Sequence, residues 1–140
     1  MSAEPEAPAD AVRAVFFDVD FTLIYPGPTF QAEGYRAFCT KHGLTVDAAR
    51  FSDAVARAAA LLECPDHVYD ADVFIRYTSG IITGMGGAGA RVEPCAREIY
   101  DEWSSYHHFS LYPDVEPALR ELAARGLRIG LVSNSQRPLA

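Results

Sequence analysis

Two short apolar runs stand near the ends of the chain, and the residues between them are patterned as helices. The first run, Arg13 to Asp18, is rich in Val and Phe, which predicts a strand buried on both faces, as in a parallel sheet. The second run, Leu127 to Val132, follows a helix and a glycine. A helix, a glycine and a buried strand form the second half of a βαβ unit. The pattern therefore predicts an α/β fold with two parallel core strands.

Helical spacing of apolar residues dominates the remainder of the chain. Gly43 is a candidate C-cap for the first helix, and Thr45 or Asp47 is a candidate start for the second. Asp114 is a candidate N-cap for the last helix, which leads into the second strand. The predicted helices cover residues 30–42, 45–63, 69–82, 93–106 and 114–125, with a loop at 84–89.

This order of elements predicts three parts. Residues 1–12 are rich in Ala, Pro and Glu, and we expect a disordered leader because they offer nothing to bury. Residues 13–25 and 110–140 are expected to form a partial α/β core. Residues 26–109 are expected to form a helical insertion between the two core strands.

Composition narrows the class of partner. The chain of 140 residues is 49% hydrophobic and 22% charged, as expected for a globular protein. Its formal charge of −7 argues against nucleic acid or an anionic membrane surface as a main partner, since both attract a basic face. No stretch approaches the ~20 apolar residues that span a bilayer, and the acidic N-terminus does not resemble a signal peptide.

The cysteines indicate a reducing compartment. Cys39, Cys64 and Cys95 lie far apart, with no C-x-x-C pair. An odd number at such spacings favours reduced, buried thiols over a disulfide framework or a zinc site. We therefore expect a cytoplasmic protein.

Polar residues with catalytic potential follow each predicted core strand. Asp18 and Asp20 end the first strand, and strand alternation predicts that their side chains point the same way, with Thr22 close behind. Ser133 follows the second strand. Ligands of parallel sheets bind beyond the carboxyl ends of the strands, so these residues are expected to form one site.

These residue types suit phosphoryl transfer. An ionised aspartate can attack phosphorus and form an acyl phosphate if the phosphoryl charge is neutralised. Mg²⁺ suits that task because it prefers hard oxygen ligands. A second carboxyl group can then serve as general acid and base, which contributes about 10²–10⁴-fold to the rate.

The same residues resemble a known family. The segment Phe16 to Leu23 is similar to the first motif of the haloacid dehalogenase-like (HAD) hydrolases, and Leu131 to Asn134 is similar to their second motif. The predicted insertion resembles the helical C1-type cap of that superfamily, and the resemblance spans residues 13–137. It implies a Rossmann-like parallel core, with the cap inserted after the first strand, where it closes over the site and selects substrates.

Carried over by position, the resemblance implies a role for each matched residue. Asp18 would be the nucleophile and a Mg²⁺ ligand, and Asp20 would be the acid/base with its carbonyl also on the metal. Thr22 would steady the loop and help to bind phosphate, and Ser133 and Asn134 would bind the substrate phosphate. Dehalogenases of the family lack the aspartate that matches Asp20, so the implied activity is hydrolysis of a small phosphorylated metabolite.

Two features depart from the family pattern. The position of Phe21 is commonly glycine, and phenylalanine has poor access to positive φ, so we expect a changed loop shape or a ring that faces the cap and substrate. The family also has a lysine and a further acidic pair after the second motif. Beyond Ser133 the sequence offers Arg137 as its basic residue and runs to Ala140. We therefore expect the sequence to be an N-terminal fragment.

Other motifs are interpreted without a catalytic role. The run Gly84 to Gly89 matches G-x-G-x-x-G but follows a predicted helix, which favours a loop over a dinucleotide site. His107 and His108 are adjacent and cannot share one site on a helix, so a helix end or linker is expected. Cys64 and His67 lack the further pair that a zinc site needs.

A second hypothesis belongs to a different class. The chain would then be a non-catalytic binding or regulatory module, or half of a protein whose partner chain supplies the missing groups. Two strands and one helix cover little sheet surface, so the isolated chain is expected to be poorly folded or oligomeric.

Overall fold

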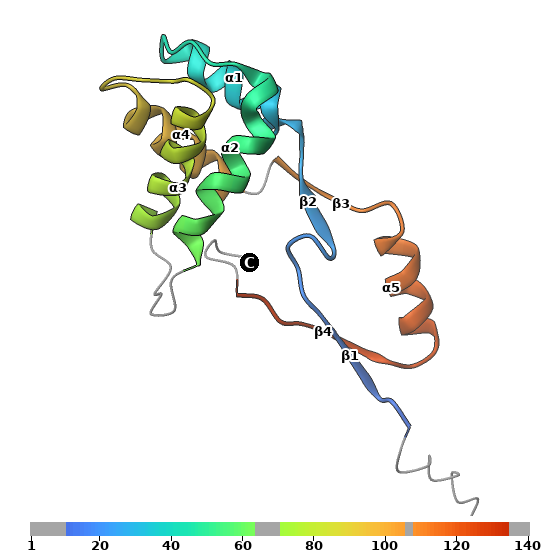
Figure 1. Cartoon of the computed structure of the whole chain (residues 1–140). Helices are drawn as coiled ribbons and strands as arrows, with labels where there is room; N and C mark the ends of the chain where they lie inside the picture. Colours follow the sequence, from blue (N-terminus) through green and yellow to red (C-terminus); the bar gives the residue numbers. More distant parts are fainter. Residues whose placement is uncertain (1–10, 64–70, 106–107, 135–140) are drawn as a thin grey trace, which may run out of the picture. The chain divides into compact units, whose positions relative to one another are not determined.

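A computed structural model describes residues 11–63, 71–105 and 108–134 (Figure 1). Most of the predicted leader lies outside these residues, as do Cys64, His67, His107 and Arg137. The elements in chain order are β1 (Ala14–Phe17), β2 (Ile24–Pro26), η1 (Pro28–Phe30), α1 (Ala32–Lys41), η2 (Ala48–Arg50), α2 (Phe51–Ala58), η3 (Ala59–Leu62), α3 (Ala71–Gly84), α4 (Val92–Ser104), β3 (Phe109–Leu111), α5 (Val115–Ala124) and β4 (Arg128–Leu131).

The chain divides into two compact units. The described part of the first unit comprises residues 11–25 and 111–134, and that of the second comprises residues 26–63, 71–105 and 108–110. The first unit contains β1, α5 and β4, and the second contains α1 to α4. The chain thus has the mixed α/β character that the sequence predicts. No helix of the described chain is long and apolar enough to cross a membrane.

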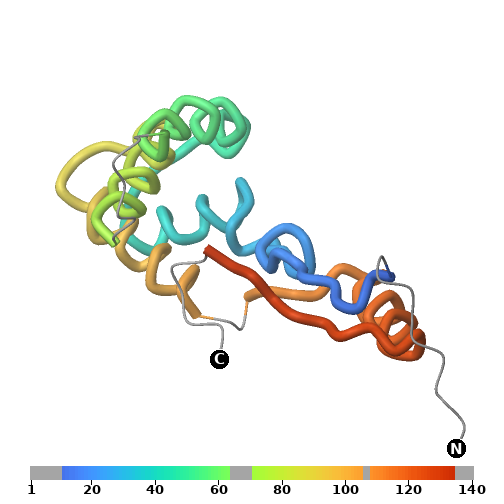
Figure 2. Tube along the Cα trace, turned by 90° about the horizontal axis from the view of Figure 1, so that it is seen from below, coloured from blue at the N-terminus to red at the C-terminus, as the bar shows by residue number. Residues whose placement is uncertain are grey.

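The first unit is built on a parallel pair of strands. β1 and β4 pair in parallel, with Ala14 opposite Arg128 and Phe17 opposite Leu131. The N–H of Val132 donates to the carbonyl of Phe17 at 2.9 Å and extends the pairing past the end of β4. Figures 1 and 2 show β1 in blue beside β4 in red, although nearly the whole described chain separates them in sequence. The predicted pairing of the two apolar runs is confirmed.

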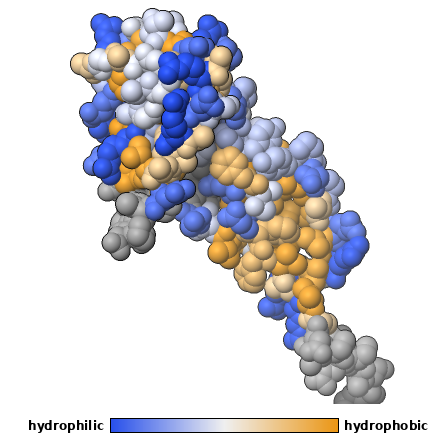
Figure 3. Space-filling view, viewed as in Figure 1, coloured by the Kyte–Doolittle hydropathy of each residue, from blue (hydrophilic) through white to orange (hydrophobic). Residues whose placement is uncertain are grey.

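One predicted property of these strands is wrong. The sequence pattern predicts burial on both faces, but the side chain of Phe16 is 68% exposed, that of Leu131 is 60% and that of Val132 is 62%. Figure 3 shows apolar residues gathered on the surface of this unit. The sheet of β1 and β4 has two strands within the described residues, so much of its apolar surface faces solvent. A Val- and Phe-rich run reports the propensity to form a strand, whereas burial depends on what covers the sheet.

Phe16 is partly accommodated by the opposite strand. Gly130 is its register partner, and a Cβ built on Gly130 would lie 2.5 Å from the Phe16 ring. The ring therefore lies across the glycine backbone and covers a position where a side chain would leave no room. Such an aromatic–glycine pair stabilises a strand that the glycine alone would weaken.

A second short sheet, of β2 and β3, was not predicted. The boundaries between the two units, at residues 25–26 and 110–111, lie inside these strands. Gly27 donates its N–H to the carbonyl of His108 at 2.8 Å, and Tyr112 donates to Leu23 at 3.1 Å. Strands of three residues give no useful periodicity, and the run Pro26 to Pro28 indicates a break in the chain.

The second unit has a compact apolar core. Its buried members come from η1, α1, α2, α3 and α4 and from the loop residues Leu44 and Met85. The largest of its fully buried side chains are Ile81, Ile82, Met85, Ile99, Cys39 and Cys95. Trp103, the single tryptophan, packs edge-on against Phe30 and Phe109, each at 5.0 Å between ring centroids.

The C-terminus of α1 confirms the cap predicted at Gly43. Gly43 has a φ of +70°, which glycine adopts without steric cost. Its N–H donates to the carbonyl of Thr40 at 2.9 Å, and the N–H of Leu44 donates to that of Cys39 at 2.8 Å. This pair of bonds is a Schellman motif, and buried Leu44 supplies the apolar contact that commonly accompanies it.

The second predicted helix is interrupted. The single helix expected over residues 45–63 is instead η2, α2 and η3 in succession. Asp47 does cap its start, since its carboxylate accepts from the N–H of Ala49 at 2.9 Å. Its most buried side chains are Ala54 and Ala58. Only small side chains fit at this contact, because α2 and α3 approach each other closely. A Cβ built on Gly84 would lie 2.7 Å from the Cβ of Ala54.

The cap predicted for the last helix is confirmed in position only. Asp114 occupies the N-cap position of α5, but its side chain makes no capping hydrogen bond within the described chain. Its φ of −89° and ψ of −10° are helical, whereas an N-cap residue that bonds the first turn is usually extended. The buried face of α5 begins with Val115.

Two glycines inside helices are expected to respond with opposite sign to alanine. In α3, a Cβ on Gly80 would make ordinary contacts of 3.5 Å, so Gly80→Ala should raise the free energy of unfolding by about 0.5–1 kcal/mol through helix propensity. In α1, a Cβ on Gly34 would lie 1.9 Å from the carbonyl oxygen of Thr29, so Gly34→Ala should lower it by about 1–3 kcal/mol. Urea unfolding followed by Trp103 fluorescence measures both. Stabilisation by Gly34→Ala would contradict the close packing of η1 on α1.

Candidate functional site

The carboxyl ends of β1 and β4 lie at the same edge of the parallel pair. Phe17 is opposite Leu131, and the backbone bond from Val132 to Phe17 continues the pairing. Asp18 follows β1 directly, and Ser133 follows two residues after the end of β4. Asp18 is exposed and Ser133 is half-buried. Two of the predicted site residues, Asp18 and Ser133, thus follow the ends of two paired strands within one unit.

The Asp18 carboxylate is held by the threonine of its own motif. The hydroxyl of Thr22 donates to Oδ2 of Asp18 at 3.0 Å. Both side chains are exposed, whereas Val19 between the two aspartates is buried, and Asp20 is half-buried. The alternation places the polar side chains of the motif away from the apolar interior. The bond restricts rotation of the carboxylate and leaves its other oxygen available to a ligand.

A tight turn carries the motif from β1 to β2. The carbonyl of Val19 accepts three N–H groups, from Thr22 at 3.3 Å, Leu23 at 2.9 Å and Ile24 at 3.2 Å. The turn is closed from the other side by the N–H of Phe21, which donates to Ile24 at 2.7 Å. Because four of its N–H groups bond within the turn and Leu23 is buried, its conformation is specified locally.

Phe21 adopts the conformation that the sequence pattern argues against. Its φ is +61°, and in the described chain it is the one non-glycine residue with positive φ. Phenylalanine thus occupies the left-handed region here, although its side chain disfavours positive φ. A Cβ in this region costs about 1–2 kcal/mol, and the closing bonds of the turn offset it.

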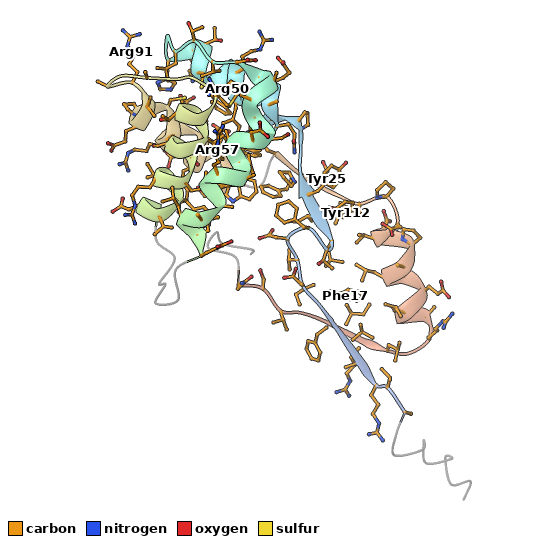
Figure 4. The ribbon with its side chains drawn as sticks, in the orientation of Figure 1. Phe17, Tyr25, Arg50, Arg57, Arg91 and Tyr112 are labelled. Carbon is orange, nitrogen blue, oxygen red and sulfur yellow. The ribbon has the colours of Figure 1, made fainter. Side chains whose placement is uncertain are left out.

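The turn also contacts the second segment of its unit, residues 111–134. Besides the backbone bond from Tyr112 to Leu23, the rings of Tyr25 and Tyr112 lie 4.8 Å apart with an interplanar angle of 35°. Figure 4 shows these two labelled rings next to each other, beyond the turn. The sequence does not predict this pair, because Tyr25 lies in a three-residue strand and Tyr112 directly follows another, and such short strands give no clear periodic signal.

The predicted magnesium ligands are oxygen donors of the right kind. Asp18 and Asp20 offer carboxylates, and Mg²⁺ commonly takes one or two carboxylates and retains several waters. Within the described residues, no group of three or more His, Cys, Asp or Glu side chains is arranged to hold a metal ion. The two aspartates thus fit part of a magnesium site.

In the helical unit, carboxylates pair with histidines. Glu98 contacts Nε2 of His42 at 2.5 Å and forms an ion pair with Lys41. The hydrogen bonds from Lys41 and His42 lower the pKa of Glu98, and the bond to Glu98 raises the pKa of Lys41. Because the pKa of Glu98 is lower in the folded protein, its ionised form stabilises the fold at pH values above the ordinary glutamate pKa of about 4.3. This stabilisation is lost as the pH falls through the pKa of the folded state.

The second histidine pair involves His108, one of the two histidines predicted to lie at a helix end or in a linker. His108 lies between α4 and β3, as expected for a linker position, and its Nε2 contacts Oε2 of Glu102 at 2.5 Å. Its Nδ1 lies 3.4 Å from the hydroxyl of Thr29, and its ring packs edge-on against Phe30. These contacts connect the end of α4 to η1.

Two of the three cysteines confirm the prediction of buried, reduced thiols. Cys39 and Cys95 are fully buried, free, and 4.0 Å apart between sulfur atoms. The hydrogen bond to Cys39, together with burial, raises the pKa of Cys95, which keeps that thiol protonated. A protonated thiol is a weak nucleophile and metal ligand, so Cys95 is best described as a core residue.

The loop predicted at Gly84 to Gly89 is confirmed except for Gly84 itself, which ends α3. It joins α3 to α4, with no strand before it, so the geometry of a dinucleotide fingerprint is absent from this part of the described chain. Gly86 and Gly89 have φ values of +108° and +98°. The N–H of Asp47 donates to the carbonyl of Met85 at 2.9 Å, which fixes the start of this loop against η2.

A cleft of about 770 Å³ lies between α3 and the start of α4. Its lining is mixed, with apolar Ile75 and Val92 beside the guanidinium groups of Arg76 and Arg97. Glu93 accepts from Arg97 at 3.2 Å. The sequence does not predict this cleft, because charges at helical spacing are typical of any solvated helix face.

No protein-family model matches the chain, and no curated protein is significantly similar to it. The motifs after β1 and β4 and their geometry are therefore the basis for assigning a function.

Proposed function

We propose that the protein is a magnesium-dependent phosphatase of the HAD type that acts on a small phosphate monoester in the cytoplasm. The observation that carries the proposal is the parallel pairing of β1 with β4, after which Asp18 and Ser133 follow the paired strand ends. The motif residues lie in the first unit, and residues 26–109 would serve as a helical cap that selects substrates.

Asp18 would act as the nucleophile. Its free carboxylate oxygen attacks the phosphorus atom, the bond from phosphorus to the alcohol oxygen breaks, and an aspartyl phosphate forms. The hydrogen bond from Thr22 to Oδ2 supports this role because it orients the carboxylate before substrate binds. Exposure of Asp18 gives the substrate access without a rearrangement of the turn.

Asp20 would move the protons. Its carboxyl group gives a proton to the departing alkoxide, and the resulting carboxylate takes a proton from the water that attacks the aspartyl phosphate. Hydrolysis releases inorganic phosphate and restores Asp18. Backbone bonds around Val19 fix the main chain on both sides of Asp20, which limits the positions that its side chain can reach.

Ser133 and Asn134 would bind the phosphoryl oxygens, the serine by its hydroxyl and the asparagine by its backbone N–H. Asp18 and Asp20 would hold Mg²⁺, which when bound neutralises phosphoryl charge. The further lysine and acidic pair that the HAD resemblance implies do not match residues of this sequence.

The exposed apolar surface of the first unit favours one alternative. Phe16, Leu131 and Val132 are each more than half exposed, which is typical of surfaces that contact another segment or protein. A non-catalytic binding module, or a half-protein completed by a partner chain, would use such a surface. Phosphatase activity of the purified chain alone would argue against both versions of this alternative.

Metal dependence tests the proposal. We expect the protein, incubated with p-nitrophenyl phosphate and Mg²⁺, to release phosphate. Chelation with EDTA should abolish that release, and added Mg²⁺ should restore it, because Asp18 cannot attack a phosphoryl group whose charge is not neutralised. Release that persists in EDTA would contradict a magnesium-dependent reaction, and no release in either condition would favour the non-catalytic alternative.

A further inference from the structure

The cleft between α3 and the start of α4 lies within the helical unit. Its volume of about 770 Å³ is in the range of pockets that hold small molecules, about 300–1,000 Å³. The space stays open because the loop before α4 carries small residues. Within the described residues, a Cβ built on Gly89 would meet no atom within 4 Å, and the neighbouring Ala90 is exposed. The two helices thus pack through their buried residues and leave a hollow at the surface.

Two guanidinium groups line this cleft, one from each helix. Arg76 lies on α3 and Arg97 lies on α4. Arg97 shares its charge with Glu93, one helical turn earlier, at 3.2 Å between Nη2 and Oε1. None of the ion pairs formed among the described residues involves Arg76. The charge of Arg76 is therefore available to a ligand.

The acidic residues of the lining do not cancel this charge. The carboxylate of Glu93 is already matched by Arg97. Asp72 lies in the first turn of α3, where the partial positive charge of a helix N-terminus favours a carboxylate. Asp72 and Arg76 are four residues apart on α3, yet no ion pair joins them in the described chain. The cleft therefore presents an uncompensated guanidinium.

The remaining lining suits an apolar group with a polar anchor. Ile75 belongs both to the lining and to the apolar core, and Val92 packs against that core at the start of α4. Ser79 adds a hydroxyl group. Ile75, Arg76 and Ser79 share one face of α3, because residues three and four apart on a helix are neighbours. Apolar walls with a few polar anchors are typical of sites that bind small molecules.

We propose that this cleft binds a small organic anion in which a phosphoryl or carboxylate group is joined to an apolar body. The planar guanidinium of Arg76 donates to two oxygens of the anion, which is the recognition that arginine offers to phosphates and carboxylates. The hydroxyl of Ser79 donates to a further oxygen, and the apolar body lies against Val92. The inference is independent of the phosphatase function proposed above, because the motif residues of that function lie in the first unit.

Isothermal titration calorimetry of the full chain with phenylphosphonate tests the proposal. This probe joins phosphoryl oxygens to a phenyl ring through a P–C bond, so a phosphatase does not hydrolyse it. We expect one-to-one binding with a Kd on the order of 1 mM. Arg76→Gln should raise the Kd by about 10-fold, because it removes a charge-assisted pair of hydrogen bonds. Ala90→Phe leaves the charge unchanged and fills the cleft, so it should weaken binding by a similar factor.

Arg57→Gln is the matched control. Arg57, labelled in Figure 4, is an exposed arginine on α2 of the same unit and is not part of the lining, so this variant should keep the wild-type Kd. Benzoate carries a carboxylate in place of the phosphonate, and comparison of the two probes shows which anionic group the cleft prefers. Benzylammonium has a similar ring and the opposite charge, and it should not bind.

Three results would overturn the inference while leaving the phosphatase function open to its own test. The first is the absence of binding of both phenylphosphonate and benzoate. The second is a Kd that neither Arg76→Gln nor Ala90→Phe changes, or that Arg57→Gln raises as much as Arg76→Gln, because the anion would then bind elsewhere or through net charge alone. The third is tighter binding of benzylammonium than of phenylphosphonate, which would mean that the acidic residues dominate the cleft.

Discussion

Replacement of Asp18 by asparagine is expected to lower the rate of phosphate release by at least about 10³-fold. An amide is a poor nucleophile, so the aspartyl phosphate cannot form. Asparagine has nearly the same shape, and its amide oxygen can still accept the hydrogen bond from Thr22, so the turn should keep its conformation. Initial rates with p-nitrophenyl phosphate at saturating Mg²⁺ measure the loss.

Asp114→Asn is the matched control for this substitution. Asp114 is an exposed aspartate of the same unit, and its side chain makes no capping hydrogen bond within the described chain. The control should keep wild-type turnover. An Asp18→Asn protein that retains turnover within about tenfold of the wild type would remove Asp18 from the mechanism, because loss of a covalent nucleophile costs far more than this.

The largest expected effect on stability comes from the core of the helical unit. Ile82 on α3 has no exposed surface, and its replacement by alanine leaves a cavity that the packed helices fill only in part. Such a substitution lowers the free energy of unfolding by about 2–5 kcal/mol. Urea unfolding followed by Trp103 fluorescence is a suitable measurement, because Trp103 lies on α4 of the same unit.

Leu61→Ala provides the reference for this measurement. Leu61 is 48% exposed on η3, so its truncation removes little buried surface and should change the midpoint only slightly. If Ile82→Ala and Leu61→Ala lowered the free energy of unfolding equally, the fluorescence of Trp103 would not report on a core centred on α3. A loss below about 1 kcal/mol for Ile82→Ala would mean that the unit is packed more loosely than the described core.

Features that depend on neighbouring residues were predictable from the sequence. The cap at Gly43 needs one glycine after an amphipathic helix, and the two strands that flank Asp18 and Ser133 are short apolar runs. The parallel pairing of those strands follows from the helix and glycine between them. The bond from Thr22 to Asp18 likewise joins residues four apart, so both partners stand inside the predicted motif.

Features that depend on distant residues were not predictable. Ala54 is buried because Gly84 admits α2 close to α3, which no periodic pattern of α2 alone reveals. Phe16 is exposed because the described sheet has two strands, although its sequence is typical of a buried strand. The left-handed Phe21 violates a local preference, and the closing bonds of its turn override that preference.

The pairing of β1 with β4 has a consequence for how the chain acquires its structure. During synthesis β1 emerges well before its partner β4, because the whole helical unit lies between them in sequence. Closing so long a loop is entropically unfavourable, and each doubling of its length adds about 0.6 kcal/mol. Prior folding of α1 to α4 shortens the effective loop, because the bond from Gly27 to His108 brings the ends of the insertion together. We therefore expect the helical unit to fold before β1 and β4 pair, so the turn that carries Asp18 gains its parallel partner only after that unit has formed.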